Sequence, residues 1–136
     1  MKKNSLNYFL IIVKAFILLA FTVICFSCTY TKIEPTCTKA LPDSISFNDH
    51  IIPIFNANCN TANCHSGSSP AGFLDLSPSV AYSKLLKKGS GYVDTINPKN
   101  SILYIQITST MPPSGDMDPC DIAMILKWIE QKAKNN

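Results

Sequence analysis

Several common catalytic patterns are missing from this 136-residue sequence. It contains no paired acids suited to acid–base catalysis, no Ser-His-Asp arrangement and no glycine-rich loop of the phosphate-binding kind. No internal repeat and no alternation of apolar and polar residues typical of β-strands stands out. These absences argue against a hydrolase, a nucleotide-dependent enzyme and a β-sheet protein. The length leaves room for one small domain, which we expect to be all-α.

Positive charge is also scarce once the first 27 residues are set apart. The whole chain has 12 Lys+Arg and 9 Asp+Glu, for a formal net charge of +3. Lys2, Lys3 and Lys14 lie in the first 27 residues, which hold no acid, so the remaining chain has a net charge of zero. No basic patch for nucleic acid is left, and we expect no nucleic-acid partner.

The first 27 residues resemble an export signal. Lysines precede an almost unbroken apolar run from Ala15 to Phe26. This run is short for a membrane-spanning helix, which needs about 20 residues. A longer count from Tyr8 would place Lys14 inside the bilayer at a substantial cost. We therefore expect residues 1–27 to be removed as a signal peptide, with an uncleaved anchor as the alternative.

The end of this signal resembles that of a bacterial lipoprotein, in which the cysteine after the cleavage site carries lipid. Ser27 is the small residue expected directly before such a cysteine, whereas a bulky residue precedes Cys25. Cys28 is therefore the predicted lipidation site. The lipid would hold the exported chain on a membrane of the cell envelope, facing the periplasm or at the outer membrane. Residues 28–44 are expected to form a tether because they show little apolar periodicity.

Residues 45–136 are expected to form the folded domain, with four helical segments. The helix-start signals are a serine cap at Ser46, Ser77-Pro78, Asn97-Pro98 or Asn100, and Asp118-Pro119. The expected segments run from Ser46 to near Cys59, from Ser77 to Gly89, from about Asn97 to Ile107, and from Asp118 towards the C-terminus. Pro53 should kink the first helix or divide it into short pieces.

The most distinctive stretch runs from Cys59 to His65, with four residues between two cysteines and a histidine after the second. Covalent haem-attachment sites have the same order with a gap of two residues. Two thiols can bond the two haem vinyl groups, and the adjoining imidazole then reaches the iron. The four intervening residues are small or turn-tolerant and permit the longer gap. We interpret Cys59 and Cys64 as thioether residues and His65 as an axial iron ligand.

A zinc site and a local disulfide are the alternatives for this stretch. Zinc cysteines can be separated by two to four residues, but no second closely spaced ligand pair occurs. Adjacent Cys64 and His65 also rarely face one metal together. Cys37 and Cys120 could complete a zinc site, but in an exported chain an even pair favours a disulfide. A bridge between Cys59 and Cys64, with His65 exposed, is the other alternative.

Met111 is the candidate for the second axial ligand. It lies in a proline-rich loop, residues 108–119, directly before two prolines. Ligation by histidine and methionine is associated with electron-transfer cytochromes c. Met117, in polar company, and Met124, inside the last helix, are weaker candidates. His50 is a rival ligand that we interpret as a solvent-facing helix residue.

The order of these elements resembles the class I cytochrome c domains. It is most similar to the envelope-lipoprotein branch of the Bacteroidetes type and to planctomycete-type cytochromes, some of which have longer gaps between the haem cysteines. The resemblance covers about residues 46–134. It rests on the following stretches: Ile51-Ile52-Pro53-Ile54-Phe55, the cysteine–histidine motif, Gly72-Phe73-Leu74-Asp75-Leu76, Asn97-Pro98 to Leu103-Tyr104, Met111-Pro112-Pro113, and Ile125 to Trp128-Ile129.

The resemblance implies a helical fold in which the first and last helices cross beside one covalent haem c. It implies thioether bonds from Cys59 and Cys64 and iron ligation by His65 and Met111. In that family a proline carbonyl orients the histidine ring, and here Pro70 and Pro78 are both possible matches. A covalent haem would complete the small core, so we expect the apo form to be poorly folded.

The function implied by the resemblance is electron transfer with redox partner proteins of the envelope, and no enzymatic activity. Two other functions stay open at the level of sequence. One is a haem enzyme or gas sensor whose sixth iron position is open. The other is a non-haem envelope lipoprotein stabilised by disulfides or zinc.

Overall fold

The computed structural model describes residues 8–9, 11–16 and 36–136. The chain divides into two compact units, Met1–Ile33 and Glu34–Asn136. Within the first unit the described residues are helical and expose their large apolar side chains. The expected cleavage point, Cys25 and Cys28 lie outside the described residues. Among the helices that can be described, none has the length and apolar character needed to cross a membrane.

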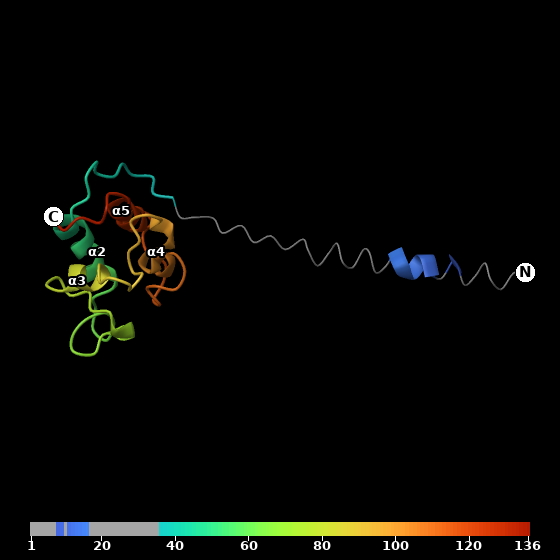
Figure 1. The fold of residues 1–136 in the computed structure, drawn as a ribbon, viewed down its shortest axis with the longest axis horizontal. Helices are drawn as coiled ribbons and strands as arrows, with labels where there is room; N and C mark the ends of the chain where they lie inside the picture. Colours follow the sequence, from blue (N-terminus) through green and yellow to red (C-terminus); the bar gives the residue numbers. More distant parts are fainter. Residues whose placement is uncertain (1–7, 10, 17–35) are drawn as a thin grey trace, which may run out of the picture. The chain divides into compact units, whose positions relative to one another are not determined.

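The second unit is helical, as the sequence predicts, and residues 36–136 contain no β-strand (Figure 1). In chain order the elements are the π-helical turn η1 (Phe47–Ile51), α2 (Ile52–Asn58), the 3₁₀ turn η2 (Ala71–Phe73), α3 (Ala81–Leu85), the 3₁₀ turn η3 (Pro98–Asn100), α4 (Ile102–Ile107) and α5 (Pro119–Glu130). All four expected helical segments are present. The second, α3, is shorter than the range predicted from Ser77 to Gly89.

The first helical segment changes its hydrogen-bond register just before Pro53. The N–H groups of Ile51 and Ile52 donate to carbonyls five residues earlier, at Ser46 and Phe47. In a regular helix the Pro53 ring would clash with the carbonyl four residues before it, and the wider π turn relieves this crowding. The break expected at Pro53 is therefore a change of hydrogen-bond register from π to α, and the two helical pieces follow one another directly as far as Cys59.

The start of η1 is capped from several directions. The Ser46 hydroxyl accepts the Asp49 N–H at 3.1 Å, and Nδ1 of His50 accepts the Ser46 N–H at 3.0 Å. The Phe47 N–H donates to the side chain of Asn136 at 3.1 Å, and the Asn48 N–H donates to its backbone oxygen at 3.0 Å. Because unpaired N–H groups at a helix start are costly, these contacts fix where the first segment begins.

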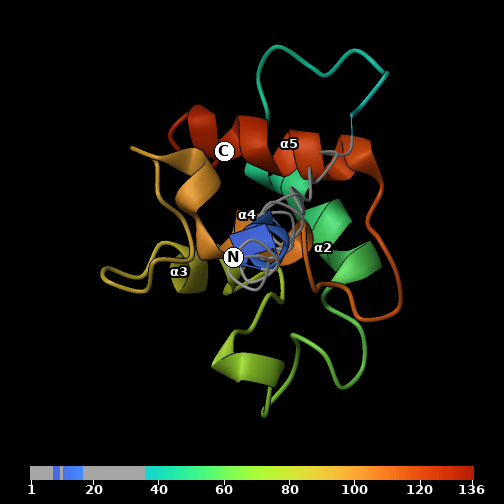
Figure 2. The same ribbon diagram turned by 90° about the vertical axis from the view of Figure 1, so that its right-hand side faces the viewer.

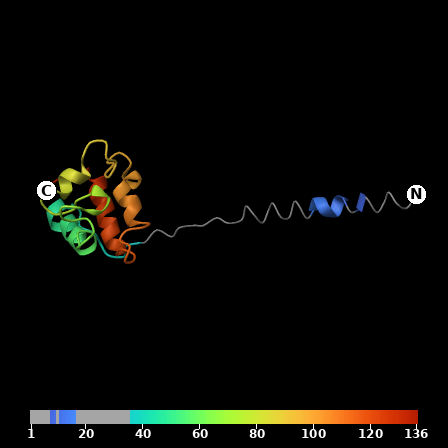
Figure 3. The same cartoon turned by 90° about the horizontal axis from the view of Figure 1, so that it is seen from below.

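Aromatic side chains form the centre of the core between η1 and α5. The Phe47 ring contacts Trp128 at a centroid distance of 5.1 Å, Tyr82 at 5.2 Å and Phe55 at 6.4 Å. The Trp128 indole N–H donates to the backbone oxygen of Lys134 at 2.9 Å, so the buried ring keeps a polar partner. The last helix, α5, packs against η1 and α4. Figure 2 shows α5 as the red helix across the top of the domain, and Figure 3 shows α4 and α5 side by side.

Cys37 and Cys120 form a disulfide, which is the pairing that the sequence predicts. Their sulfur atoms are 2.02 Å apart and their Cα atoms 4.5 Å apart. The bond joins the segment before the first helix to the first turn of α5. The bond thus ties the segment expected to be a tether, residues 28–44, to the folded domain at Cys37.

Hydrogen bonds extend this attachment along α5. The Lys127 ammonium donates to the carbonyl of Pro42, and the Gln131 side-chain amide donates to the carbonyl of Asp43, both at 2.6 Å. The Gln131 amide oxygen accepts the Ile45 N–H at 2.9 Å. The sequence gives no sign of these contacts because they use backbone groups, which every residue carries.

The disulfide should contribute strongly to stability because it links residues 83 positions apart. We expect the double variant Cys37→Ser/Cys120→Ser to lose about 2–4 kcal/mol of unfolding free energy, mainly because its unfolded chain is no longer cross-linked and has a higher conformational entropy. Denaturant titration followed by circular dichroism measures this loss. Reducing the wild type should lower its midpoint to that of the variant, and the same reductant should leave the variant unchanged. An unaltered midpoint after reduction would contradict the prediction.

Candidate functional site

A cavity of about 570 Å³ lies at the end of α2 and opens to the surface. All four residues that the sequence predicts to hold a haem line it: Cys59, Cys64, His65 and Met111. We call it the cysteine cavity. Apolar side chains form much of the remaining wall, and they include Leu74, Leu76, Ile102, Leu103 and Ile107. None of the lining residues is an aspartate, glutamate, lysine or arginine.

The four-residue gap between the cysteines is accommodated by a closed turn. Cys59 ends α2, and its N–H donates to the Phe55 carbonyl at 2.8 Å. Its own carbonyl accepts the His65 N–H at 3.0 Å, which closes the turn across the gap. Asn63 takes a positive φ of 66°, a conformation that asparagine tolerates better than most residues. The extra residues are therefore absorbed without moving the cysteines and the histidine away from one cavity.

The two cysteines of the motif are both free thiols. Cys59 is 8% exposed, and Cys64 is half-buried. The alternative of a local Cys59–Cys64 disulfide is therefore not what the structure shows. Burial raises the pKa of the Cys59 thiol, and the nearby Cys64 and Asp121 add to the effect by disfavouring a second negative charge, so that together they bring this pKa to about 11. Cys59 therefore carries its proton at neutral pH.

The imidazole of His65 is oriented by a backbone carbonyl. Its Nδ1 lies 3.0 Å from the carbonyl oxygen of Leu74. A carbonyl can only accept, so Nδ1 carries the proton in this contact and Nε2 keeps its lone pair in the neutral ring. An N–H bond to a carbonyl is the usual way in which proteins fix the ring of a metal-binding histidine. Neither Pro70 nor Pro78, the two expected matches, makes this contact.

The segment after His65 folds back on the motif. The Leu76 N–H donates to the His65 carbonyl at 2.8 Å, and the Ala71 N–H donates to the Cys64 carbonyl at 2.9 Å. These bonds place Leu74 beside the histidine ring. Sequence reasoning missed Leu74 because its contribution is a main-chain oxygen, for which no residue type is required.

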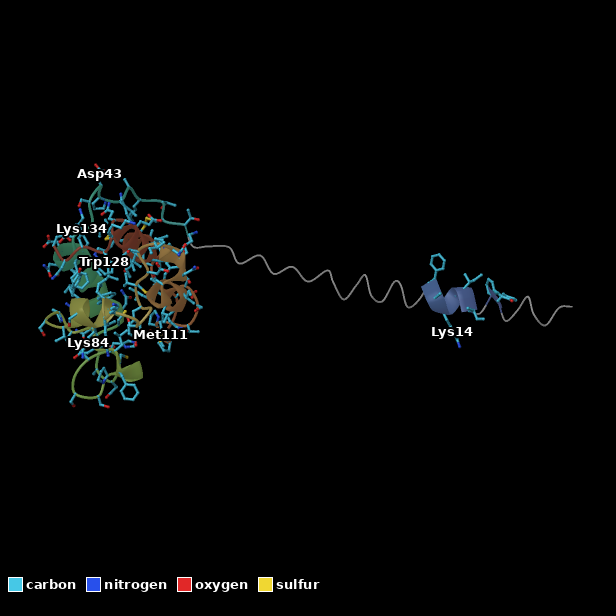
Figure 4. The ribbon with its side chains drawn as sticks, in the orientation of Figure 1. Lys14, Asp43, Lys84, Met111, Trp128 and Lys134 are labelled. Carbon is cyan, nitrogen blue, oxygen red and sulfur yellow. A yellow bond between two sulfur atoms is a disulfide. The ribbon has the colours of Figure 1, made fainter. Side chains whose placement is uncertain are left out.

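Met111, labelled in Figure 4, lies in the loop after α4 and lines the cavity. Its N–H donates to the Gln106 carbonyl at 2.9 Å, and its side chain is half-buried. The two weaker candidates do not line the cavity: Met117 is a core residue at 3% exposure, and Met124 packs against the core. Met117 lies between two aspartates in the sequence, but its own side chain is buried in the core.

His50, the rival ligand, does not line the cysteine cavity. Its Nδ1 accepts the Ser46 N–H, so the ring serves the cap of η1. It is half-buried, whereas the sequence suggested a solvent-facing side chain.

The first turn of α5 brings negative charge close to Cys59. Burial and the neighbouring Asp118 raise the pKa of the Asp121 carboxyl, while a hydrogen bond from Asn58 and the charge of Lys39 lower it. The Asn58 amide donates to Asp121 at 3.4 Å. At the start of a helix a carboxylate is normally favoured, so here burial and a second acid oppose that effect.

The geometry does not support the zinc alternative. The sulfurs of Cys37 and Cys120, which could have completed a site with Cys59 and Cys64, are joined to each other. In the part of the chain that the structure describes, no three residues among histidine, cysteine, aspartate and glutamate gather as a metal site would require.

Comparison with known proteins found no protein-family model, curated protein or solved structure that matches this chain. Its function must therefore follow from the chemistry of the site. The cysteine cavity brings together two free thiols, an imidazole with an available Nε2, and a thioether, within largely apolar walls.

Proposed function

We propose that this protein is a monohaem cytochrome c that transfers single electrons in the bacterial envelope. The observation that carries the proposal is that Met111 lines the same cavity as the motif residues Cys59, Cys64 and His65, although it comes from a separate part of the chain. Two thiols, an imidazole and a thioether form the donor set of a covalent haem with histidine and methionine ligation.

The residues of the cavity fit such a group. Its volume of about 570 Å³ is of the size typical for cofactor sites, which span roughly 300–1,000 Å³. The walls are largely apolar, which suits the faces of a macrocycle. Both motif cysteines are free, so both thiols are available for thioether bonds. A haem held here would supply a one-electron iron couple, and the protein would supply ligands and an apolar environment.

Each ligand residue has a defined part in this proposal. His65 would bind through Nε2, because the Leu74 carbonyl holds its Nδ1 proton. Met111 would approach from the loop after α4, on which Pro112 and Pro113 also line the cavity. A methionine sulfur at that position would raise the potential of the iron relative to a second histidine.

The finer architecture and the location belong to the same proposal. We infer a class I cytochrome c-like arrangement, with η1–α2 and α5 packed against each other beside the haem site. The contact between the first and last helical segments supports it. The predicted signal, residues 1–27, and lipid at Cys28 would place the protein on an envelope membrane, where it would exchange electrons with redox partner proteins.

A pyridine haemochrome spectrum together with the intact mass tests the proposal. The chain should be exported in a host whose haem-attachment system processes long cysteine gaps. We expect the mass of one added haem and the spectrum of a haem with two thioether bonds. The variant Cys59→Ala/Cys64→Ala should carry no covalent haem.

The matched control for that experiment is Cys37→Ser/Cys120→Ser, which removes two other cysteines of the same domain. This variant should keep the covalent haem, because Cys37 and Cys120 form a disulfide in the wild type and neither lines the cavity. A colourless wild-type protein without added mass would rule out the cytochrome and leave a non-haem lipoprotein.

A further inference from the structure

The two long segments that flank the cysteine cavity contain no charged side chain. Residues 60–74 and residues 101–115 have no lysine, arginine, aspartate or glutamate, and both contribute to the cavity wall. The rest of residues 36–136 carries eight lysines and eight acids. Charge is therefore common on this domain but sparse beside the cavity, where Asp75, between the lining residues Leu74 and Leu76, and Asp116 mark the ends of the two segments. We call residues 60–74 and 101–115 the uncharged rim.

An exposed aromatic residue stands on this rim. Phe73 is 95% exposed, and its neighbours Gly72 and Leu74 both line the cavity. Phe73 has a positive φ of 58°, which is unusual and strained for a bulky residue. In Figure 1 the segment that carries η2 projects from the body of the domain. The backbone thus holds an apolar ring in solvent beside the cavity.

On the other segment, α4 adds exposed apolar surface to the rim. Ile102 lines the cavity and remains 39% exposed, and Ile105 is 47% exposed. Large aromatic side chains that project from a surface are typical anchors of protein interfaces, where they fill a pocket on the partner. Apolar residues on both flanks of one opening favour a contact surface over isolated exposed residues.

We propose that the uncharged rim is the docking surface for a redox partner whose own docking face is uncharged and apolar, with a hollow that takes the Phe73 ring. This inference rests on the proposed function, since the rim surrounds the cavity that would hold the haem. A partner face rich in charge would lose hydration against this rim and gain no ion pair in return. We therefore expect the face of the partner that contacts the rim to be uncharged.

The kinetics of such a contact differ from those of electrostatically steered redox pairs. Steered association is fast at low salt and slows steeply as ionic strength rises. Without steering, association should run at about 10⁵–10⁶ M⁻¹s⁻¹. It should also change little with salt.

The test follows reduction of the full-length holoprotein by membranes of its source organism, monitored through the haem spectrum. We expect the rate to change less than twofold between low and high salt, and Phe73→Ser to lower it by roughly tenfold or more, as for an interface anchor. The matched control is Ile96→Ser, which removes another apolar side chain, 85% exposed and outside the rim. It should leave the rate unchanged.

Three outcomes would overturn the docking proposal while leaving the cytochrome assignment intact. They are an unchanged rate for Phe73→Ser, a rate that falls steeply with salt, and wild-type protein that is not reduced by membranes which reduce their own c-type haems. The cytochrome assignment is tested separately by the haemochrome spectrum and intact mass, and a protein without covalent haem would contradict it. A normal haem spectrum for Phe73→Ser excludes misfolding as the cause of a slower rate.

Discussion

On the proposed cytochrome function, replacing Met111 with alanine should open one face of the haem iron while leaving the domain folded. Met111 is half-buried in a loop and lines the cysteine cavity, so its loss removes little core packing. Without the thioether, we expect the methionine-to-iron charge-transfer band to vanish and the reduced protein to become high-spin and bind carbon monoxide readily. The potential should fall by on the order of 0.1 V, within the range of about 0.8 V that axial ligands control.

Met124→Ala is the matched control for this variant. Met124 is also half-buried, but it packs against the core from α5 and does not line the cavity. It should keep the charge-transfer band and the resistance to carbon monoxide. If the Met111 variant keeps the band, another group is the sixth ligand. If the wild type already binds carbon monoxide readily, the sixth position is open and the haem enzyme or gas sensor is the better assignment.

Much of the helical layout could be predicted because its signals are local. Serine, aspartate and proline mark the starts of the first and last segments, and the structure places the Ser46 and Asp118 caps as expected. The disulfide was predictable for a different reason: only Cys37 and Cys120 remained after the other cysteines were assigned. That Met111 would lie beside the cysteine motif was predicted from its proline-rich loop and from the resemblance, because about fifty residues separate the two and no local signal joins them.

The contacts that sequence reasoning missed are made by backbone groups. The Leu74 carbonyl beside His65 and the carbonyls of Pro42 and Asp43 on α5 would be present whatever the residue type. The end of α3 was also misplaced, because Gly89 marks a stop without showing where the last hydrogen bond lies. Local propensity therefore predicted the elements, while long-range main-chain bonds determined how they close around the cavity.

Producing the chain without haem should leave a domain that is well packed only on the side away from the cysteine cavity. Without haem, the apolar walls of this 570 Å³ cavity face solvent and lack the packing partners that a core side chain needs. The walls should therefore loosen, whereas the core around Phe47 and Trp128 and the disulfide do not depend on haem.

Hydrogen exchange on the exported wild-type chain, with and without a haem-attachment system in the host, measures this difference. In the apo form we expect protection to be lost in residues 60–76 and in α4 and retained in α5, with binding of a hydrophobic dye to the exposed walls. The holoprotein should protect all three regions. Both samples keep the disulfide because both are exported, so the comparison isolates the haem. Equal protection and equal melting temperatures would show that the cavity is stable without a cofactor, and haem could then not be a structural part of this fold.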